Sequence, residues 1–278
     1  MINLGEYQEL RIVKKTDHGV YLSEIDGGVE KVLLPKNQVE DSFKMGDIIK
    51  VFIYKDSMDR IIATTSEPFV TLGELASLRV TQVNSVGAFL DWGLVKDLLL
   101  PYKEQTYPVK VDDKVLVSVY IDKSNRLCAT MKVYDYLNTN SPYNKNDTVT
   151  ATVISYNENY GVFVAVDNLY NGLIPNNEYQ TIPKLGSTIT AFVTEVRPDG
   201  KLNLTQKKKV TEQIADDATI ILEKLKVAGG FLPYNDKSAP DAIKKEFNLS
   251  KNSFKKAIGN LYKNKTITIE PDGIHLCK

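Results

Sequence analysis

The chain has 278 residues, with 35 Lys and Arg against 35 Asp and Glu, so its formal net charge is zero. This balance argues against a protein that coats a polyanion along its whole length, but it leaves room for a local basic patch. With 42% hydrophobic and 25% charged residues, the composition is that of an ordinary globular protein. The length suffices for roughly two to four small domains.

The cysteines and the distribution of apolar residues indicate in which cellular compartment the protein resides. Cys128 and Cys277 lie far apart and in no metal-ligand spacing, which favours free thiols in a reducing environment over a disulfide scaffold. The first residues lack the basic and apolar blocks of a signal peptide, and no apolar run approaches the length of a membrane span. We therefore expect a cytoplasmic protein with no membrane partner.

Residues 1–209 contain three copies of one pattern. Each copy begins with a glycine, an apolar residue and an aromatic residue: Gly19-Val20-Tyr21, Gly87-Ala88-Phe89 and Gly161-Val162-Phe163. Two apolar residues and a proline follow each time: Leu33-Leu34-Pro35, Leu99-Leu100-Pro101 and Leu173-Ile174-Pro175. Each copy closes on a short run from a basic residue to a threonine: Arg60 to Thr64, Arg126 to Thr130 and Lys201 to Thr205. Landmarks that recur in one order indicate an internal repeat.

Each copy has several short β-rich runs and little helix. About five strands within such a short unit favour a small closed barrel of the OB type, which removes its strand edges by closure. We predict three tandem five-stranded barrels, over residues 1–66, 67–140 and 141–209, and a fold that is mainly β.

The third copy shows its strand pattern most clearly. Val162, Val164 and Val166 alternate, as the buried face of a strand does. Phe163 should therefore lie on the opposite face, toward water, and Tyr160 precedes the glycine of the same strand. Two outward aromatic residues form the kind of stacking platform that single-stranded nucleic-acid binders use.

The phrases Tyr-Gly-Val-Phe, Gly-Leu-Ile-Pro, Gly-Ser-Thr-Ile and Asp-Gly-Lys-Leu-Asn-Leu-Thr make the third copy resemble the ribosomal-protein S1-type RNA-binding domain, an OB-fold. The earlier copies resemble diverged versions of it. In that family RNA meets two aromatics of the second strand, a residue after the Gly-Leu pair, and an acidic–basic pair near the last turn. The resemblance assigns these roles to Tyr160, Phe163, Pro175, Arg197 and Lys201, to His18, Tyr21, Asp56 and Arg60, and to Val86, Phe89, Asp122 and Arg126.

Some of these positions depart from the family pattern. Proline stands in all three copies where the family often has histidine, which removes one hydrogen-bond donor. Val86 has lost its aromatic ring, and Arg197 stands where the family often has aspartate. The balance of Lys and Arg over Asp and Glu is −2 for residues 1–66, −1 for 67–140 and +1 for 141–209. Charge and aromatic residues together make the third barrel the predicted principal RNA-binding barrel.

Over residues 210–278 the apolar period becomes helical. After a first helix, Ser238 followed by Pro240 predicts a capping box at the start of a second. A third helix follows, and then a hairpin of residues 266–276. Three helices and a two-stranded wing predict a winged-helix domain.

The later part of this domain is basic. Residues 244–265 contain seven lysines against one acid, a local charge of +6. Such lysines would meet phosphates as point charges and give salt-dependent, sequence-tolerant affinity. The predicted contacts are Lys251, Lys255 and Lys256, with Lys207 and Lys208 of the preceding three-lysine run. A solvated helix face is the alternative, and the lack of arginine after residue 209 disfavours base-specific reading of a major groove.

Three such barrels and a winged helix resemble the bacterial conserved virulence factor B family of RNA-binding regulators. Two phrases carry the match, Lys-Asp-Leu-Leu-Leu-Pro-Tyr-Lys-Glu-Gln at residues 96–105 and Ser-Phe-Lys-Lys-Ala-Ile-Gly-Asn-Leu-Tyr-Lys at residues 253–263. The resemblance implies RNA binding and a post-transcriptional influence on gene expression, which in that family concerns virulence factors.

The sequence contains no Gly-x-x-x-x-Gly-Lys-Ser/Thr loop, no His-Glu-x-x-His and no Cys-x-x-Cys. We therefore expect no enzyme, no metal site and no cofactor. The leading hypothesis is a regulator that binds single-stranded RNA, with the ribosome or RNA-processing proteins as further partners. Two alternatives stay open: a protein-docking scaffold of the translation or RNA-processing machinery, and a DNA-binding regulator that acts through the winged helix.

Overall fold

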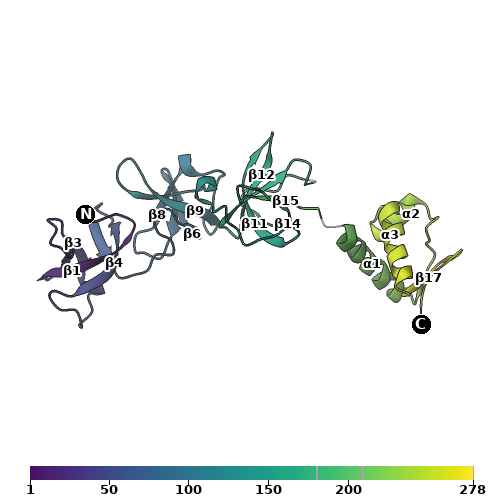
Figure 1. The fold of residues 1–278 in the computed structure, drawn as a ribbon, viewed down its shortest axis with the longest axis horizontal. Coiled ribbons are helices and arrows are strands. Elements are labelled where there is room, and N and C mark those ends of the chain that lie inside the picture. The colour runs from purple at the N-terminus through teal and green to yellow at the C-terminus, as the bar shows by residue number, and fades with distance from the viewer. Residues whose placement is uncertain (180, 208–209, 278) are drawn as a thin grey trace. The chain divides into compact units, whose positions relative to one another are not determined.

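The structure is a computed structural model that describes residues 1–179, 181–207 and 210–277, the side chains of 210–213 excepted. Over these residues the chain forms two compact units, 1–206 and 207–278 (Figure 1). The described part of the first unit holds three closed five-stranded barrels, and that of the second holds three α-helices and a small sheet. The predicted fold, mainly β with a winged helix at the C-terminus, is confirmed.

The three barrels share one strand order. The first is built from β1 (Tyr7–Thr16), β2 (Gly19–Ser23), β3 (Val32–Pro35), β4 (Ile48–Lys55) and β5 (Ile61–Thr64), which close in the order β1-β2-β3-β5-β4. The second repeats this order with β6 (Leu75–Asn84), β7 (Gly87–Asp91), β8 (Leu98–Pro101), β9 (Lys114–Ile121) and β10 (Leu127–Thr130). The third does so with β11 (Thr148–Asn157), β12 (Gly161–Val166), β13 (Tyr170–Pro175), β14 (Thr188–Val196) and β15 (Leu202–Thr205).

Short 3-10 helices lie outside the strands. They are η1 (Lys36–Gln38), η2 (Tyr102–Glu104) and η3 (Tyr134–Tyr136). The first two follow the third strand of their barrel, whereas η3 lies between the second and third barrels.

The glycine and the proline of each repeat are cross-strand partners: Gly19 with Pro35, Gly87 with Pro101, and Gly161 with Pro175. Gly161 has a φ of +124°, and a Cβ atom there would lie 2.1 Å from the carbonyl oxygen of Ile174. A Cβ atom at either of the other two landmark glycines, Gly19 and Gly87, would also lie less than 3.0 Å from a carbonyl oxygen. Each repeat thus needs glycine because two backbones approach too closely for a side chain.

A register shift in the first strand recurs in all three barrels. It falls between Ile12 and Lys14, between Val80 and Gln82, and between Val153 and Ser155. A bulge bends and twists a strand. In each barrel the first strand pairs with the second strand on both sides of the shift, and with the fourth strand only before it. This allows a five-stranded sheet to close.

The predicted inward face of β12 is confirmed. Val162, Val164 and Val166 are fully buried, and they pack in a core with Ile174 and Leu204.

The first two barrels share apolar contacts. The ring of Trp92 meets Phe52 and Tyr54 edge-on, with centroids 5.9 and 6.4 Å apart. These rings belong to one buried cluster together with residues of the second barrel's core.

The C-terminal unit contains α1 (Val210–Val227), β16 (Phe231–Leu232), α2 (Pro240–Phe247), α3 (Lys251–Lys263), β17 (Ile267–Glu270) and β18 (Gly273–Leu276). The predicted hairpin is β17–β18, and β16 adds a third strand in the order β16-β18-β17. The sequence did not predict β16 because two residues are too short to show a period. None of the described helices is long and apolar enough to cross a membrane.

The capping box at Ser238 was wrong. The N-cap of α2 is Ala239, which forms no side-chain cap hydrogen bond. The Ser238 hydroxyl instead accepts from the backbone N–H of Asn235, 2.9 Å away. Pro240 at the first helical position needs no partner for a backbone N–H, which reduces the need for a cap.

Candidate nucleic-acid interface

The turn before the last strand has the same backbone geometry in all three barrels. In each, a residue's N–H donates to the carbonyl oxygen four residues later, at 2.9–3.0 Å: Asp56 to Arg60, Asp122 to Arg126, and Arg197 to Lys201. The acidic–basic positions suggested by the sequence therefore coincide in the three barrels. Arg197 occupies the place of the two aspartates.

In the first two barrels this turn holds a forked ion pair. One carboxylate oxygen of Asp122 accepts from Nε and Nη2 of Arg126, at 3.0 and 2.8 Å. Asp56 and Arg60 form the same fork at 2.9 and 2.7 Å. Partial burial alone would raise the pKa of each aspartate, but hydrogen bonds from the arginine and the backbone outweigh it and hold the pKa below its usual value.

The third barrel has two cations at the same turn. The guanidinium of Arg197 pairs with Asp199 at 3.1 Å. Lys201 does not meet an acid in the corresponding fork, because the aspartate is missing; its Nζ lies 3.2 Å from the hydroxyl of Tyr134. The turn thus has a cation where its counterparts have aspartate, but Asp199 brings the net charge of residues 197–201 to +1, the same as that of residues 122–126.

Phe163, Arg197 and Lys201 come together on the surface of the third barrel, where they line one small cavity with Tyr134 and Leu173. Its volume is about 20 Å³, enough for little more than one water molecule. Phe163 is half-buried, and the ring of Tyr134 meets it edge-on with centroids 5.3 Å apart. The predicted open face of Phe163 is thus partly filled by another part of the chain.

A strap of residues 133–139, which follows the second barrel, holds Tyr134 in this position. Val133 and Leu137 are buried with Ile154 of the third barrel. The buried side-chain amide of Asn171 donates to the carbonyl oxygens of Tyr134 and Leu137, at 3.4 and 3.1 Å. The strap is therefore anchored by the apolar packing of Val133 and Leu137, on either side of Tyr134, and by hydrogen bonds to the carbonyl oxygens of Tyr134 and Leu137.

Tyr160 lies apart from this cavity. It sits in the turn between β11 and β12, and 63% of its surface is exposed. Its backbone N–H donates to Asn157. The two predicted platform residues thus differ in exposure: the side chain of Tyr160 is open to solvent, whereas Phe163 is half-buried beside Tyr134.

In the first two barrels the corresponding aromatic residues are Tyr21 and Phe89, both half-buried on the outer face of the second strand. His18 is exposed in the turn before it, and so is Val86. Tyr21 pairs across the sheet with Leu33, as Phe89 does with Leu99.

The predicted phosphate contacts of the C-terminal unit lie mainly on α3. Ser250 caps this helix by accepting from the N–H of Ser253 at 3.1 Å. Lys255 and Lys256 are exposed on the side opposite the buried Phe254 and Ile258. Lys255 also faces Asp236 at 3.9 Å, and Lys251 is half-buried.

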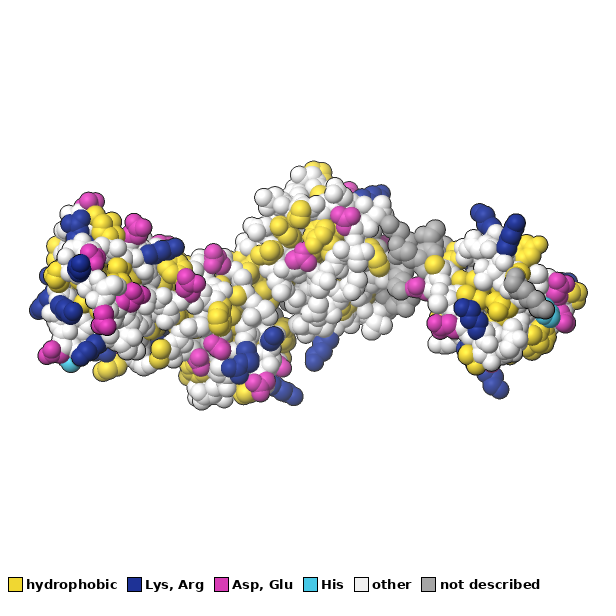
Figure 2. Space-filling model, turned by 90° about the horizontal axis from the view of Figure 1, so that it is seen from below, with side chains coloured by type: hydrophobic (Ala, Val, Ile, Leu, Met, Phe, Trp, Pro, Cys, Tyr) yellow, Lys and Arg dark blue, Asp and Glu magenta, His cyan; other side chains and the backbone are white. Residues whose placement is uncertain are grey.

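Lys207 is exposed just after the third barrel, and Lys208 lies outside the described residues. Figure 2 shows the Lys and Arg side chains of the C-terminal unit at separate points on the visible face, and mixed charge over the N-terminal part. On this face the basic side chains do not form one continuous patch.

Tyr134 was not among the residues selected from the sequence. The available signal was the run Val133, Tyr134, Tyr136 and Leu137, which places two aromatic and two apolar side chains in the connection after the second barrel. Aromatic residues seldom stand in a free linker without a packing partner.

Comparison with known proteins gives matches over nearly the whole chain. An S1 domain model matches residues 4–66 and 72–132, a model of the second domain of the virulence regulatory factor CvfB matches 134–208, and a CvfB-like winged helix domain model matches 219–276. The chain is 31% identical over 261 residues to Conserved virulence factor B of Staphylococcus epidermidis (strain ATCC 12228), covering 90% of this chain and 87% of that protein.

Two further relatives have similar coverage. The protein YitL of Bacillus subtilis (strain 168) is 32% identical over 270 residues, with 94% and 89% of the two chains covered. A crystal structure of a multidomain protein with nucleic acid binding domains from Streptococcus pneumoniae TIGR4 is 28% identical, with 99% and 98% coverage and a TM-score of 0.52.

Proposed function

Since the chain belongs to the conserved virulence factor B family, we propose that it is a cytoplasmic regulator that binds single-stranded RNA and influences gene expression post-transcriptionally. The S1 and winged-helix domains, with the family's name, support a nucleic-acid-binding regulatory protein. RNA as the ligand, single strands as its form and post-transcriptional action are the specific content of the proposal.

One observation carries the proposal: an aromatic residue and two cations converge on the third barrel. Phe163 comes from β12, and Arg197 and Lys201 come from the turn between β14 and β15, yet all three line one cavity. An aromatic face beside cations suits a base next to its phosphate. Bases can stack on such a face only when they are unpaired, which favours single strands over duplexes.

The winged helix would add affinity rather than sequence preference. Lys251, Lys255 and Lys256 suit phosphate contacts, because an ammonium group is a compact point charge. Arginine, which reads guanine in a bidentate manner, does not occur after residue 209. The ribosome or RNA-processing proteins would be reached through the bound RNA or as additional partners.

A titration of the full-length protein with labelled single-stranded RNA, duplex RNA and duplex DNA at two salt concentrations tests the proposal. We expect the tightest binding for single-stranded RNA and a moderate salt dependence. Preference for duplex DNA, abolished by Gln substitutions at Lys255 and Lys256, would identify a DNA-binding regulator instead. Failure to bind any nucleic acid at low salt would favour the protein-docking scaffold.

A further inference from the structure

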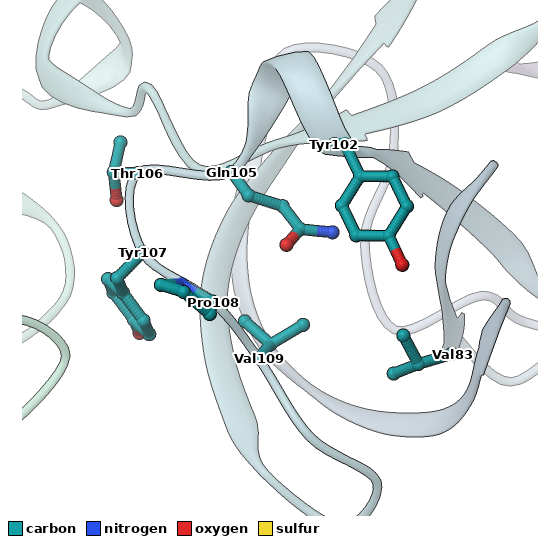
Figure 3. Close-up of a pocket in the computed structure, with 7 residues that line it drawn as sticks. All are labelled: Val83, Tyr102, Gln105, Thr106, Tyr107, Pro108 and Val109. Atoms are coloured by element: carbon teal, nitrogen blue, oxygen red, sulfur yellow. The ribbon is translucent and has the colours of Figure 1, made fainter. Parts of the chain in front are cut away.

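The second barrel carries an open groove beside the turn that has lost its aromatic residue. The groove has a volume of about 500 Å³ and lies between the end of β6 and the connection from β8 to β9. Figure 3 shows Tyr102 and Gln105 facing each other in it, with Val83 near Tyr102 and with Tyr107 at the opposite end. The volume is within the range of small-ligand sites, roughly 300–1,000 Å³.

The ring of Tyr102 is both exposed and fixed. Half of the residue's surface is accessible. Its hydroxyl donates to the carbonyl oxygen of Asn84 at 2.6 Å, and its own carbonyl oxygen accepts from the N–H of Gln105 at 3.1 Å. Because the hydroxyl and the backbone of Tyr102 are both hydrogen-bonded, its side chain loses little conformational entropy when a ligand stacks on the ring.

The third barrel makes the same contact without a ring. Asn176 follows Pro175 as Tyr102 follows Pro101, and its side-chain amide donates to the carbonyl oxygen of Glu158 at 2.6 Å. Glu158 precedes the landmark glycine by three residues, as Asn84 does. The residue after the proline thus contacts the same turn in both barrels.

Beside the turn between the first and second strands, each barrel has a ring side chain at one of two positions. The turn position and the position after the proline are His18 and Lys36 in the first barrel, Val86 and Tyr102 in the second, and Tyr160 and Asn176 in the third. The second barrel has therefore lost the ring of the turn and has gained one from η2, hydrogen-bonded to the same turn.

We propose that Tyr102 and this groove bind an unpaired nucleobase of RNA, an inference that rests on the proposed function and adds a site to it. The residues that line the groove are uncharged, which suits a flat neutral heterocycle better than a phosphate. Gln105 donates through Nε2 to the carbonyl oxygen of Leu100 at 3.3 Å, so its Oε1 is the amide atom that would accept from a base amino group. Tyr102 supplies the stacking face.

The proposal is tested with Tyr102→Leu, which keeps apolar volume and removes the ring, in the full-length protein. We expect its affinity for a labelled single-stranded oligoribonucleotide to fall about tenfold, the effect of one lost base stack. Val86→Tyr in the Tyr102→Leu background restores a ring on the turn, as in the third barrel, and should recover most of the affinity. Tyr102→Phe keeps the ring and should bind close to the wild-type level.

A second measurement uses RNA that contains 5-iodouridine, which on irradiation forms a covalent bond with a stacked aromatic ring. The crosslinked peptide should contain Tyr102. Wild-type RNA affinity in Tyr102→Leu, with thermal melting unchanged and no crosslink at Tyr102, would overturn this inference and leave the proposed function standing. If the wild-type protein binds no single-stranded RNA at all, the proposed function fails, and this inference fails with it.

Discussion

The ring of Tyr134 stands edge-on against the ring of Phe163, with centroids 5.3 Å apart and planes at 90°. Tyr134 belongs to the strap of residues 133–139, and Phe163 belongs to the strand that carries the predicted stacking face of the third barrel. A base that stacks on Phe163 must therefore compete with Tyr134. The ring of Tyr134 also contacts Lys201, whose ammonium group lies 5.2 Å from the ring centroid.

Replacing Tyr134 by alanine should strengthen the binding of single-stranded RNA. The substitution uncovers the Phe163 ring and releases Lys201 for a phosphate. We expect the dissociation constant to fall about threefold or more, since a base stacked on an aromatic ring contributes roughly 1–3 kcal/mol. Fluorescence anisotropy with a short labelled oligoribonucleotide measures the change.

Two variants make this prediction specific. Tyr136→Ala removes a half-buried ring from the same 3-10 helix and should leave the affinity unchanged. In the double variant Tyr134→Ala, Phe163→Ala the gain should vanish. A gain that survives without Phe163, or no gain in Tyr134→Ala, would show that Tyr134 does not compete with RNA.

Alanine at Gly161 should destabilise the third barrel by more than alanine at Gly46 destabilises the first barrel. Both glycines have positive φ, +124° and +91°, so both substitutions cost about 1 kcal/mol in backbone strain. Only at Gly161 does the new Cβ also meet a carbonyl oxygen, at 2.1 Å, whereas no atom lies within 4 Å at Gly46. We expect a total loss of about 3 kcal/mol or more at Gly161, measured by urea unfolding. Equal losses would refute the steric explanation of the repeated glycine.

Arg126→Gln should lower stability at neutral pH and have less effect in acid. The pKa of Asp122 is below its ordinary 3.8 in the folded chain, so its stabilisation is complete above that value and is lost as the pH falls through the folded pKa. Because the Arg126 side chain is 46% exposed, we expect a loss of about 1 kcal/mol or less. Unfolding at about pH 7 and about pH 3 checks the direction.

The control for this pair is Arg79→Gln. Arg79 lies 3.5 Å from Asp91 and 3.3 Å from Asp112 and does not form the close fork. Its loss should change stability by only a few tenths of a kcal/mol, with little dependence on pH. A difference between wild type and Arg126→Gln that widens on acidification would contradict the assigned ion pair.

Gln substitutions at Lys251, Lys255 and Lys256 together should weaken RNA binding and reduce its salt dependence. Each lysine that meets a phosphate of a single strand contributes about 0.7 to the slope of log K against log salt concentration. We expect the magnitude of the slope to fall by about two if all three make such contacts. Binding isotherms at several salt concentrations measure it.

The matched control replaces Lys14, Lys15 and Lys31, all exposed on or near the acidic first barrel. This triple variant has the same change in net charge. An equal reduction of the slope in both triple variants would indicate a general effect of net charge, and would argue against a specific role for α3.

Local signals in the sequence predicted most of the fold. The alternation of Val162 and Val164, and the glycine and proline landmarks, are short-range patterns that the backbone enforces wherever a strand must bury one face or approach another closely. The hairpin β17–β18 was predicted for the same reason. One expectation failed for a local reason, because Ser238 accepts from the nearby N–H of Asn235 instead of capping α2. One element was missed because a tertiary contact decides it: β16 exists through its pairing with β18.

The candidate site shows the same division. The sequence by itself determined three copies of one barrel, with an aromatic residue on the second strand and a basic residue at the last turn of each, because both belong to repeated local motifs. Only the tertiary structure decided which of these aromatic faces is open. Tyr134 reaches Phe163, and Tyr102 reaches the turn at Asn84, through contacts between segments distant in the chain. No local pattern records such contacts, because they depend on how the closed barrels and their connections pack.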